Sequence, residues 1–166
     1  MTKHTDTSQL QQKNLVSVLK EMLKGGHAHV TFEQAVDKLP AALRGVVPEG
    51  LPYSIWQLVE HIRITQWDIL EFSRDPAHKS PAWPDEYWPT ETAPSDETAW
   101  KRTLNDIASD TKAFIALLES PDADLYTPFS HGDGQNLLRE AILIVDHTSY
   151  HTGEIILLRR MLGAWD

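Results

Sequence analysis

The segment LLREAILIVDHTSYHTGEIILLRRMLGAW, residues 137–165, carries the longest helical pattern in the chain. Its apolar residues recur at spacings of three and four, which is the period of an α-helix with one apolar face. We therefore predict a helix from about Asn136 to Leu162. At the rise of an α-helix, about 27 residues span some 40 Å, which is the length of a long helix in a bundle.

Two histidines belong to the face of this helix that is predicted to point inward. The inward stripe consists of Leu137, Ala141, Ile144, Thr148, His151, Ile155, Leu158 and Leu162. His147 lies beside it, and residues four apart project from one side, so His147 and His151 can share a metal ion. A shared ion gives each buried imidazole a partner for one ring nitrogen. The alternative is a pair of ordinary interior histidines bonded to nearby hydroxyls or carbonyls.

Other helical patterns precede this segment. Apolar spacing predicts a first helix at residues 9–23, which the glycine pair 25–26 ends. A capping box of Thr31 and Gln34 opens a short helix that Pro40 ends. The two prolines and the glycine that follow predict a connector rather than a further helix.

Two more long helices follow the connector. Ser54 and Gln57 form a second capping box, and the apolar stripe behind it predicts a helix that runs to about Arg74. Ser95 is the predicted cap of the next helix, which Pro121 ends.

Between these two helices, residues 75–94 form a predicted loop. They hold five prolines and the aromatic motif WPDEYWP at residues 83–89, which together exclude a long helix. We expect Trp83, Tyr87 and Trp88 to form a lid packed on the helices rather than a binding platform.

The fold class predicted from these patterns is all-α. No segment shows the period-two alternation of a strand, and the loops differ greatly in length. We expect a four-helix bundle with an additional short helix and a Trp/Pro-rich loop. The whole chain, residues 1–166, forms one predicted domain with its core at about 9–163.

His61 is the best candidate for a third metal ligand. It flanks the inward stripe of another long helix, between Leu58 and Thr65. Three imidazoles around one divalent ion leave positions open for water or substrate, which is typical of a catalytic site.

Composition excludes several classes of function. The net charge of −9 and the lack of a lysine and arginine cluster oppose binding to nucleic acid. With no cysteine, the chain has no disulfide, no thiolate nucleophile and no cysteine-based metal site. Residues 1–10 lack the apolar core of a signal peptide, and no apolar run is long enough to cross a membrane. We therefore expect a cytoplasmic protein without a membrane partner.

Three segments resemble the DinB/YfiT-like superfamily of metal-dependent bacterial enzymes: SIWQLVEHIRITQWDIL, WPDEYWP and LLREAILIVDHTSYHTGEIILLRRMLGAW. The resemblance covers roughly Leu10 to Trp165 and implies an up-down-down-up four-helix bundle. It also implies a divalent ion, zinc or nickel, on His61, His147 and His151.

The resemblance further implies a small-molecule substrate, with hydrolysis or transfer of a low-molecular-weight thiol as the reaction, and a homodimer. A noncatalytic metal-binding or ligand-binding dimerisation module is the alternative. The historical family name suggests a DNA-repair factor, which the acidic composition opposes.

Several other polar residues are secondary candidates. Glu154 follows His151 by three residues and is a candidate catalytic base or an orienting partner of a ligand, or else a surface partner of Arg160. Gln57 and Tyr150 lie one turn from His61 and His147, respectively.

The remaining histidines have weaker claims to the site. His27 and His29 lie in a glycine-rich connector and are expected to be solvated loop histidines; the alternative is that they reach the mouth of the site. His4, His78 and His131 have no companions that indicate a function.

Overall fold

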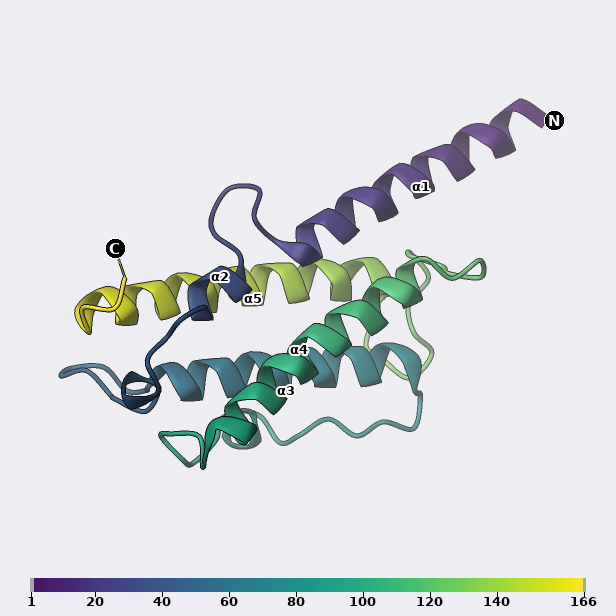
Figure 1. Ribbon diagram of the computed structural model, residues 1–166. Coiled ribbons are helices and arrows are strands. Elements are labelled where there is room, and N and C mark those ends of the chain that lie inside the picture. Colours follow the sequence, from purple (N-terminus) through teal and green to yellow (C-terminus); the bar gives the residue numbers. More distant parts are fainter. Residues whose placement is uncertain (1, 166) are drawn as a thin grey trace.

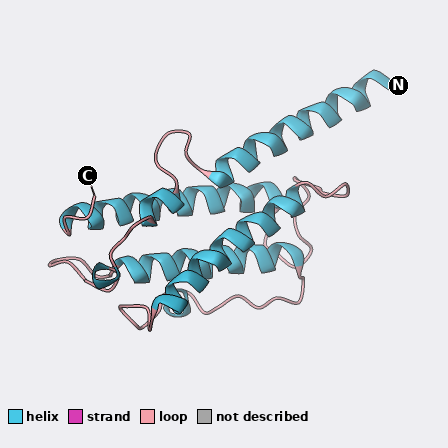
Figure 2. Cartoon of the chain, in the orientation of Figure 1, coloured by secondary structure: helices cyan, strands magenta, loops and turns pink. Residues whose placement is uncertain are grey.

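The computed structural model describes residues 2–165, with the side chains of residue 7 and of residues 9–165. This part of the chain contains helices and no strand (Figure 2), which confirms the predicted all-α class. The α-helices are α1 Thr2–Lys24, α2 Phe32–Val36, α3 Ile55–Arg74, α4 Glu97–Leu118 and α5 Leu137–Met161. Two short 3-10 helices lie between them, η1 Ala41–Leu43 and η2 Asp85–Tyr87.

Helix α3 lies at the centre of the packing and contacts both α4 and α5. Helices α3 and α4 run in the same general direction, whereas α1 and α5 run in the opposite one (Figure 1). Helix α1 touches α4 and α5, and its N-terminal part extends beyond them (Figure 1). The short helix α2 packs on α5.

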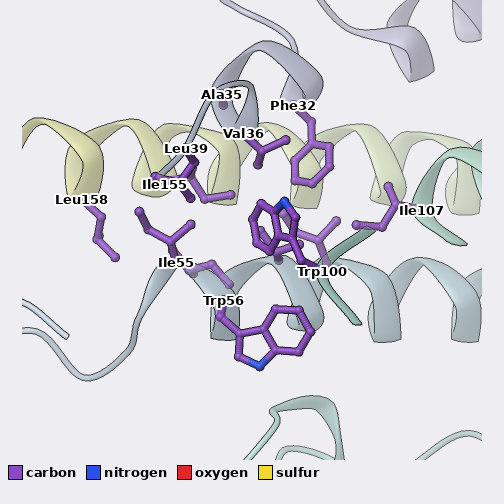
Figure 3. Packing of buried hydrophobic residues seen from close by; sticks show 13 residues of the cluster. Phe32, Ala35, Val36, Leu39, Ile55, Trp56, Trp100, Ile107, Ile155 and Leu158 are labelled. Carbon is purple, nitrogen blue, oxygen red and sulfur yellow. The ribbon is translucent and has the colours of Figure 1, made fainter. Parts of the chain in front are cut away.

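Two clusters of buried apolar residues hold these helices together. The first joins α2, α3, α4 and α5, and Trp56 and Trp100 pack beside each other within it (Figure 3). The second joins the C-terminal parts of α1, α3 and α4 to the N-terminal part of α5, with Phe114 fully buried. Burial of apolar surface in both clusters supplies the main driving force for this arrangement.

Both predicted capping boxes are present. Thr31 and Ser54 each accept a hydrogen bond from a backbone N–H in the first turn, and Gln34 and Gln57 bond back to the cap residue. These reciprocal bonds satisfy helix-end donors that otherwise lack partners. Helices α2 and α3 therefore begin where the sequence predicted.

Two predicted boundaries are wrong. Asp96, not Ser95, caps α4, because its carboxylate accepts a hydrogen bond from the backbone N–H of Ala99. Helix α1 begins at Thr2 rather than near residue 9. Leu10 belongs to the apolar spacing that predicted this helix, but it is 58% exposed, and the N-terminal part of α1 extends beyond its neighbours (Figure 1).

The Trp/Pro-rich loop lies against α3 along its length. Ser54 donates to the carbonyl of Thr92 near one end of the loop, and Gln57 donates to the carbonyl of Pro89. Tyr87, which is buried, donates through its hydroxyl to Asp68 of α3. These bonds fix the aromatic part of the loop on the middle of α3.

Within the residues that the structure describes, no helix is both long enough and apolar enough to span a membrane.

Candidate metal centre

Three histidines meet where the middle of α3 crosses the middle of α5. His61 comes from α3, and His147 and His151 come from neighbouring turns of α5. Each offers one ring nitrogen to a common point, and these nitrogens lie within 4.8 Å of one another. The predicted pair on the last helix and the predicted third ligand are therefore in one cluster.

Two of the three rings are held by hydrogen bonds on their far side. Nδ1 of His61 lies 2.8 Å from the carbonyl oxygen of Tyr87, and Nδ1 of His151 lies 2.7 Å from Oε2 of Glu154. A carbonyl or carboxylate only accepts, so each Nδ1 carries the proton. The lone pair of each ring is then on Nε2, which is available to a metal ion.

His147 completes the cluster through the same ring atom. Its Nε2 lies 3.0 Å from Nε2 of His61. Because His61 has its proton on Nδ1, the neutral His147 ring donates from Nε2 in this contact. Transfer of that proton to Nδ1 of His147 would leave three Nε2 lone pairs facing one another.

Burial favours the neutral form of His61 and His147, which is the form that binds a metal ion. His61 is 2% exposed and His151 is 7% exposed. Burial lowers the pKa of His61 below its usual value. For His147, burial and then the proximity of His151 and His61 lower the pKa to about 3. A neutral imidazole presents its lone pair to a metal ion without first losing a proton.

Aromatic rings form one wall of the site. The indole of Trp88 stacks on the imidazole of His61, with ring centroids 3.9 Å apart, and Tyr53 also stacks on Trp88, with ring centroids 5.3 Å apart. Trp88 thus has the packing role that the sequence predicted for it. Trp83 was predicted to share that role, but it is 72% exposed and lies outside the wall.

Glu154 links the aromatic wall to the histidine cluster. One carboxylate oxygen accepts from His151, and the other lies 2.7 Å from the hydroxyl of Tyr53. Burial and this bond raise the pKa of Tyr53 to about 12, so its hydroxyl stays protonated and donates. Glu154 therefore bonds His151 and Tyr53, and not Arg160.

The donor set fits a divalent transition ion. Nitrogens bound to one tetrahedral zinc ion lie roughly 3.3 Å apart, which falls between the 3.0 Å from His61 to His147 and the 4.8 Å within which all three nitrogens lie. Ligand histidines in metal sites usually donate their second N–H to a carboxylate or carbonyl, as His61 and His151 do here. Imidazole suits zinc, nickel, copper and iron, whereas the oxygen ligands that magnesium and calcium prefer are absent from the cluster.

The weaker candidates lie apart from the three ring nitrogens. Gln57 is committed to the capping box and to the loop. Tyr150 is 65% exposed, and its ring meets the edge of His151. His27 and His29 are exposed in their connector. His131 is exposed and bonds the carbonyl of Phe72, and the side chain of His4 lies outside the described residues.

No pattern in the sequence predicted the bonds that hold the loop over the site. His78 has a companion after all, because its Nε2 lies 2.8 Å from Oδ1 of Asp68. The other oxygen of Asp68 accepts from the Tyr87 hydroxyl, and the Tyr87 carbonyl accepts from His61. Asp68 and His78 are ten residues apart, across a helix end, so no helical spacing signals the pair.

Comparison with known proteins gives one result. No curated protein and no solved structure matches the chain. The family model of the DinB superfamily matches residues 27–155, which is more than half of the chain and includes all three histidines of the cluster. The chain therefore belongs to the DinB superfamily.

Proposed function

We propose that this protein binds one divalent metal ion, zinc or nickel, through His61, His147 and His151, and uses it to transform a small molecule. The observation that carries the proposal is the orientation of the rings. His61 and His151 donate from Nδ1 to fixed acceptors, so their lone pairs point to the same place as the ring of His147. Interior histidines without a ligand have no need of this arrangement.

The metal ion would act as a Lewis acid that polarises a carbonyl or activates water or a thiol for attack. Hydrolysis and transfer of a low-molecular-weight thiol both fit this chemistry. The chain has no cysteine, so a thiol nucleophile would have to come from the substrate. The thiol reaction rests on the family to which the chain belongs.

Within this site, Glu154 has the contacts of a positioning residue. Both of its oxygens accept hydrogen bonds, from His151 and from Tyr53, so neither is free to take a proton from a substrate. Its bond to Nδ1 of His151 fixes the plane of the ring. Trp88 and Tyr53 shield one side of the cluster from water.

We also propose that α1, α3, α4 and α5 form the up-down-down-up four-helix bundle. The directions of the four helices support this arrangement (Figure 1). Leu19 of α1 is buried in a cluster with residues of α3, α4 and α5. In this bundle the metal site lies between the second and fourth long helices, where bundles commonly place metal sites.

Equilibrium dialysis followed by elemental analysis of tag-free protein tests the proposal. We expect one zinc or nickel ion per wild-type chain, with loss of tight binding in His61→Ala, His147→Ala and His151→Ala. His131→Ala is the matched control, because this ring is exposed and bonds the carbonyl of Phe72 rather than a residue of the cluster. Full metal content in His61→Ala and His151→Ala would show that they are core histidines.

The loaded protein separates the two reactions from the noncatalytic alternative. Activated esters and amides test hydrolysis, and an electrophile offered with a small thiol tests transfer. Catalysis that appears with metal and disappears in His151→Ala supports an enzyme. Tight metal binding without turnover on either substrate class supports the noncatalytic alternative.

A further inference from the structure

A groove lies between α2, with the turn that follows it, and the N-terminal part of α4. Its volume of about 350 Å³ falls within the range of small-molecule sites, roughly 300 to 1,000 Å³. No residue of the histidine cluster or of the aromatic wall lines this groove. Its large apolar residues are Phe32, Val36, Leu39, Trp100, Leu104 and Ile107. A ligand here would therefore bury an apolar body, away from the metal centre.

Arg44 is the buried charged residue of this lining. It is only 8% exposed, and its guanidinium lies over the ring of Trp100, 4.5 Å from the ring centroid. Nη1 donates to Glu97, but Nε is buried and has no hydrogen-bond partner. Nη2 also has no acceptor among the residues that the structure describes. Since buried donors are usually paired, this edge of the guanidinium is ready to bind an oxygen atom from outside the chain.

The other charged residues of the lining are in contact with water. Together with Arg44, they give the groove three acidic and three basic groups, although the chain as a whole carries a net charge of −9. A solvated charge gains little from a ligand, because it must first give up water. The five exposed charged residues are Glu33, Asp37, Lys38, Glu97 and Lys101. The charge that a ligand has to complement is therefore the positive charge of Arg44.

We propose that this groove binds a small monocarboxylate with an apolar body, of the class of medium-chain fatty acids. The carboxylate accepts two parallel hydrogen bonds, from Nε and Nη2 of Arg44, while Nη1 stays on Glu97. Because Nε is covered from water, binding includes a small shift of the Arg44 side chain.

The apolar chain of the ligand lies between the two helices that form the groove. Phe32 and Val36 point from α2 toward Trp100 of α4 (Figure 3), and Leu104 continues this surface one turn further along α4. Burial of the chain against these residues supplies most of the affinity, and Arg44 selects the headgroup.

Headgroups other than a carboxylate fit the groove less well. An alcohol accepts a bond from Arg44 but carries no charge, so the bond is weaker. An amine finds no buried carboxylate in the lining, since Glu33, Asp37 and Glu97 are all exposed. The expected order of affinity is therefore carboxylate, alcohol, amine.

Isothermal titration of the full chain with octanoate, 1-octanol and octylamine tests the ligand class. We expect octanoate to bind with a Kd of about 1 mM or tighter, and at least about tenfold more tightly than the other two. His151→Ala should bind octanoate as wild type does, because the groove does not include the metal centre. Absence of octanoate binding, equal binding of octylamine, or loss of binding in His151→Ala overturns the proposal.

Substitutions in the groove test its position. Ala108→Trp fills the groove from an exposed residue of α4, so it should abolish octanoate binding and leave the melting temperature close to that of wild type. Ala116→Trp is the matched control, because Ala116 is also exposed on α4 but does not line the groove. Equal octanoate affinity in these two variants would place the ligand elsewhere and overturn the proposal.

A change in the headgroup partner tests the role of Arg44. Arg44→Lys keeps the positive charge but removes the two parallel N–H donors, so octanoate should bind about tenfold more weakly. The affinity for 1-octanol should change less, because an alcohol uses at most one of these donors. Unchanged octanoate affinity in folded Arg44→Lys, as judged by its circular dichroism, overturns recognition of the carboxylate by Arg44.

Discussion

Trp88 lies flat on His61, with the two rings 6° from parallel. The contact joins a fluorescent side chain from the loop to an imidazole of the proposed metal site on α3. Any change in the electron density or position of the imidazole therefore acts on Trp88 directly.

We predict that zinc changes the tryptophan emission of the protein in proportion to the fraction of sites filled. Zinc is redox-inactive, so the change reports the environment of Trp88 rather than electron transfer. Trp88→Phe should abolish the change although five other tryptophans remain. Trp83→Phe should retain it, because Trp83 is exposed and outside the wall. A full zinc response in Trp88→Phe would mean that the site lies elsewhere.

Removal of Glu154 should weaken metal binding without removing a ligand. Glu154→Ala leaves Nδ1 of His151 without its acceptor, and loss of such a partner typically weakens affinity about 10- to 100-fold. Tyr53→Phe removes only the second bond to the carboxylate, so a smaller loss is expected. Isothermal titration with zinc measures both, and equal affinities in Glu154→Ala and wild type would contradict the positioning role.

Loss of the Tyr87 hydroxyl should lower the stability of the fold but leave metal binding by the three histidines intact. Tyr87→Phe leaves the carbonyl that bonds His61 but strands one oxygen of the buried Asp68. A buried acceptor without its donor costs about 1–3 kcal/mol. In the absence of metal, we expect Tyr87→Phe to melt at a lower temperature than wild type. When metal is added, the variant should still bind one ion. Unchanged melting would contradict this account.

Glu140 should destabilise the fold as pH rises. Burial raises its pKa above the ordinary value, and Arg139 offsets the effect only in part. The raised pKa means that stability is greatest below the ordinary carboxyl pKa and is lost as pH rises through the folded-state pKa. Glu140→Gln should therefore melt higher than wild type at pH 8 and nearly the same at pH 4.

A carboxylate with the opposite shift is the contrast for that experiment. Glu97 has a lowered pKa because Arg44 donates a hydrogen bond to it. Its stabilising effect is present at neutral pH and is lost as pH falls, so Glu97→Gln should lower the melting temperature at pH 8. If both variants changed the melting temperature in the same direction at pH 8, the opposite pKa shifts of Glu140 and Glu97 would be refuted.

The predictable parts of this structure depend on local signals. The capping boxes at Thr31 and Ser54 use residues three apart, and the His147–His151 pair uses residues four apart. His61 was found because it flanks an apolar stripe at helical period. The cap of α4 was misplaced by one position, because Ser95 and Asp96 are adjacent and both residue types are good caps.

The missed parts depend on contacts between distant segments. The Tyr87 carbonyl bonds His61, but a backbone carbonyl belongs to every residue and leaves no mark in the sequence. Tyr53 and Glu154 are 101 residues apart, and only the folded chain brings them together. Local signals also did not predict how α1 packs. Its apolar spacing predicts a helix, but it does not show which turns of that helix contact the other helices.

The wide separation of the three clustered histidines has a consequence for synthesis of the protein. His61 and His147 are 86 residues apart, and the histidine pair lies in the last helix. As the ribosome extends the chain from its N-terminus, no incomplete product that lacks α5 can assemble the cluster. Tight metal uptake would therefore begin only when α5 has been made and has docked, so bound metal would distinguish finished molecules from nascent or truncated ones.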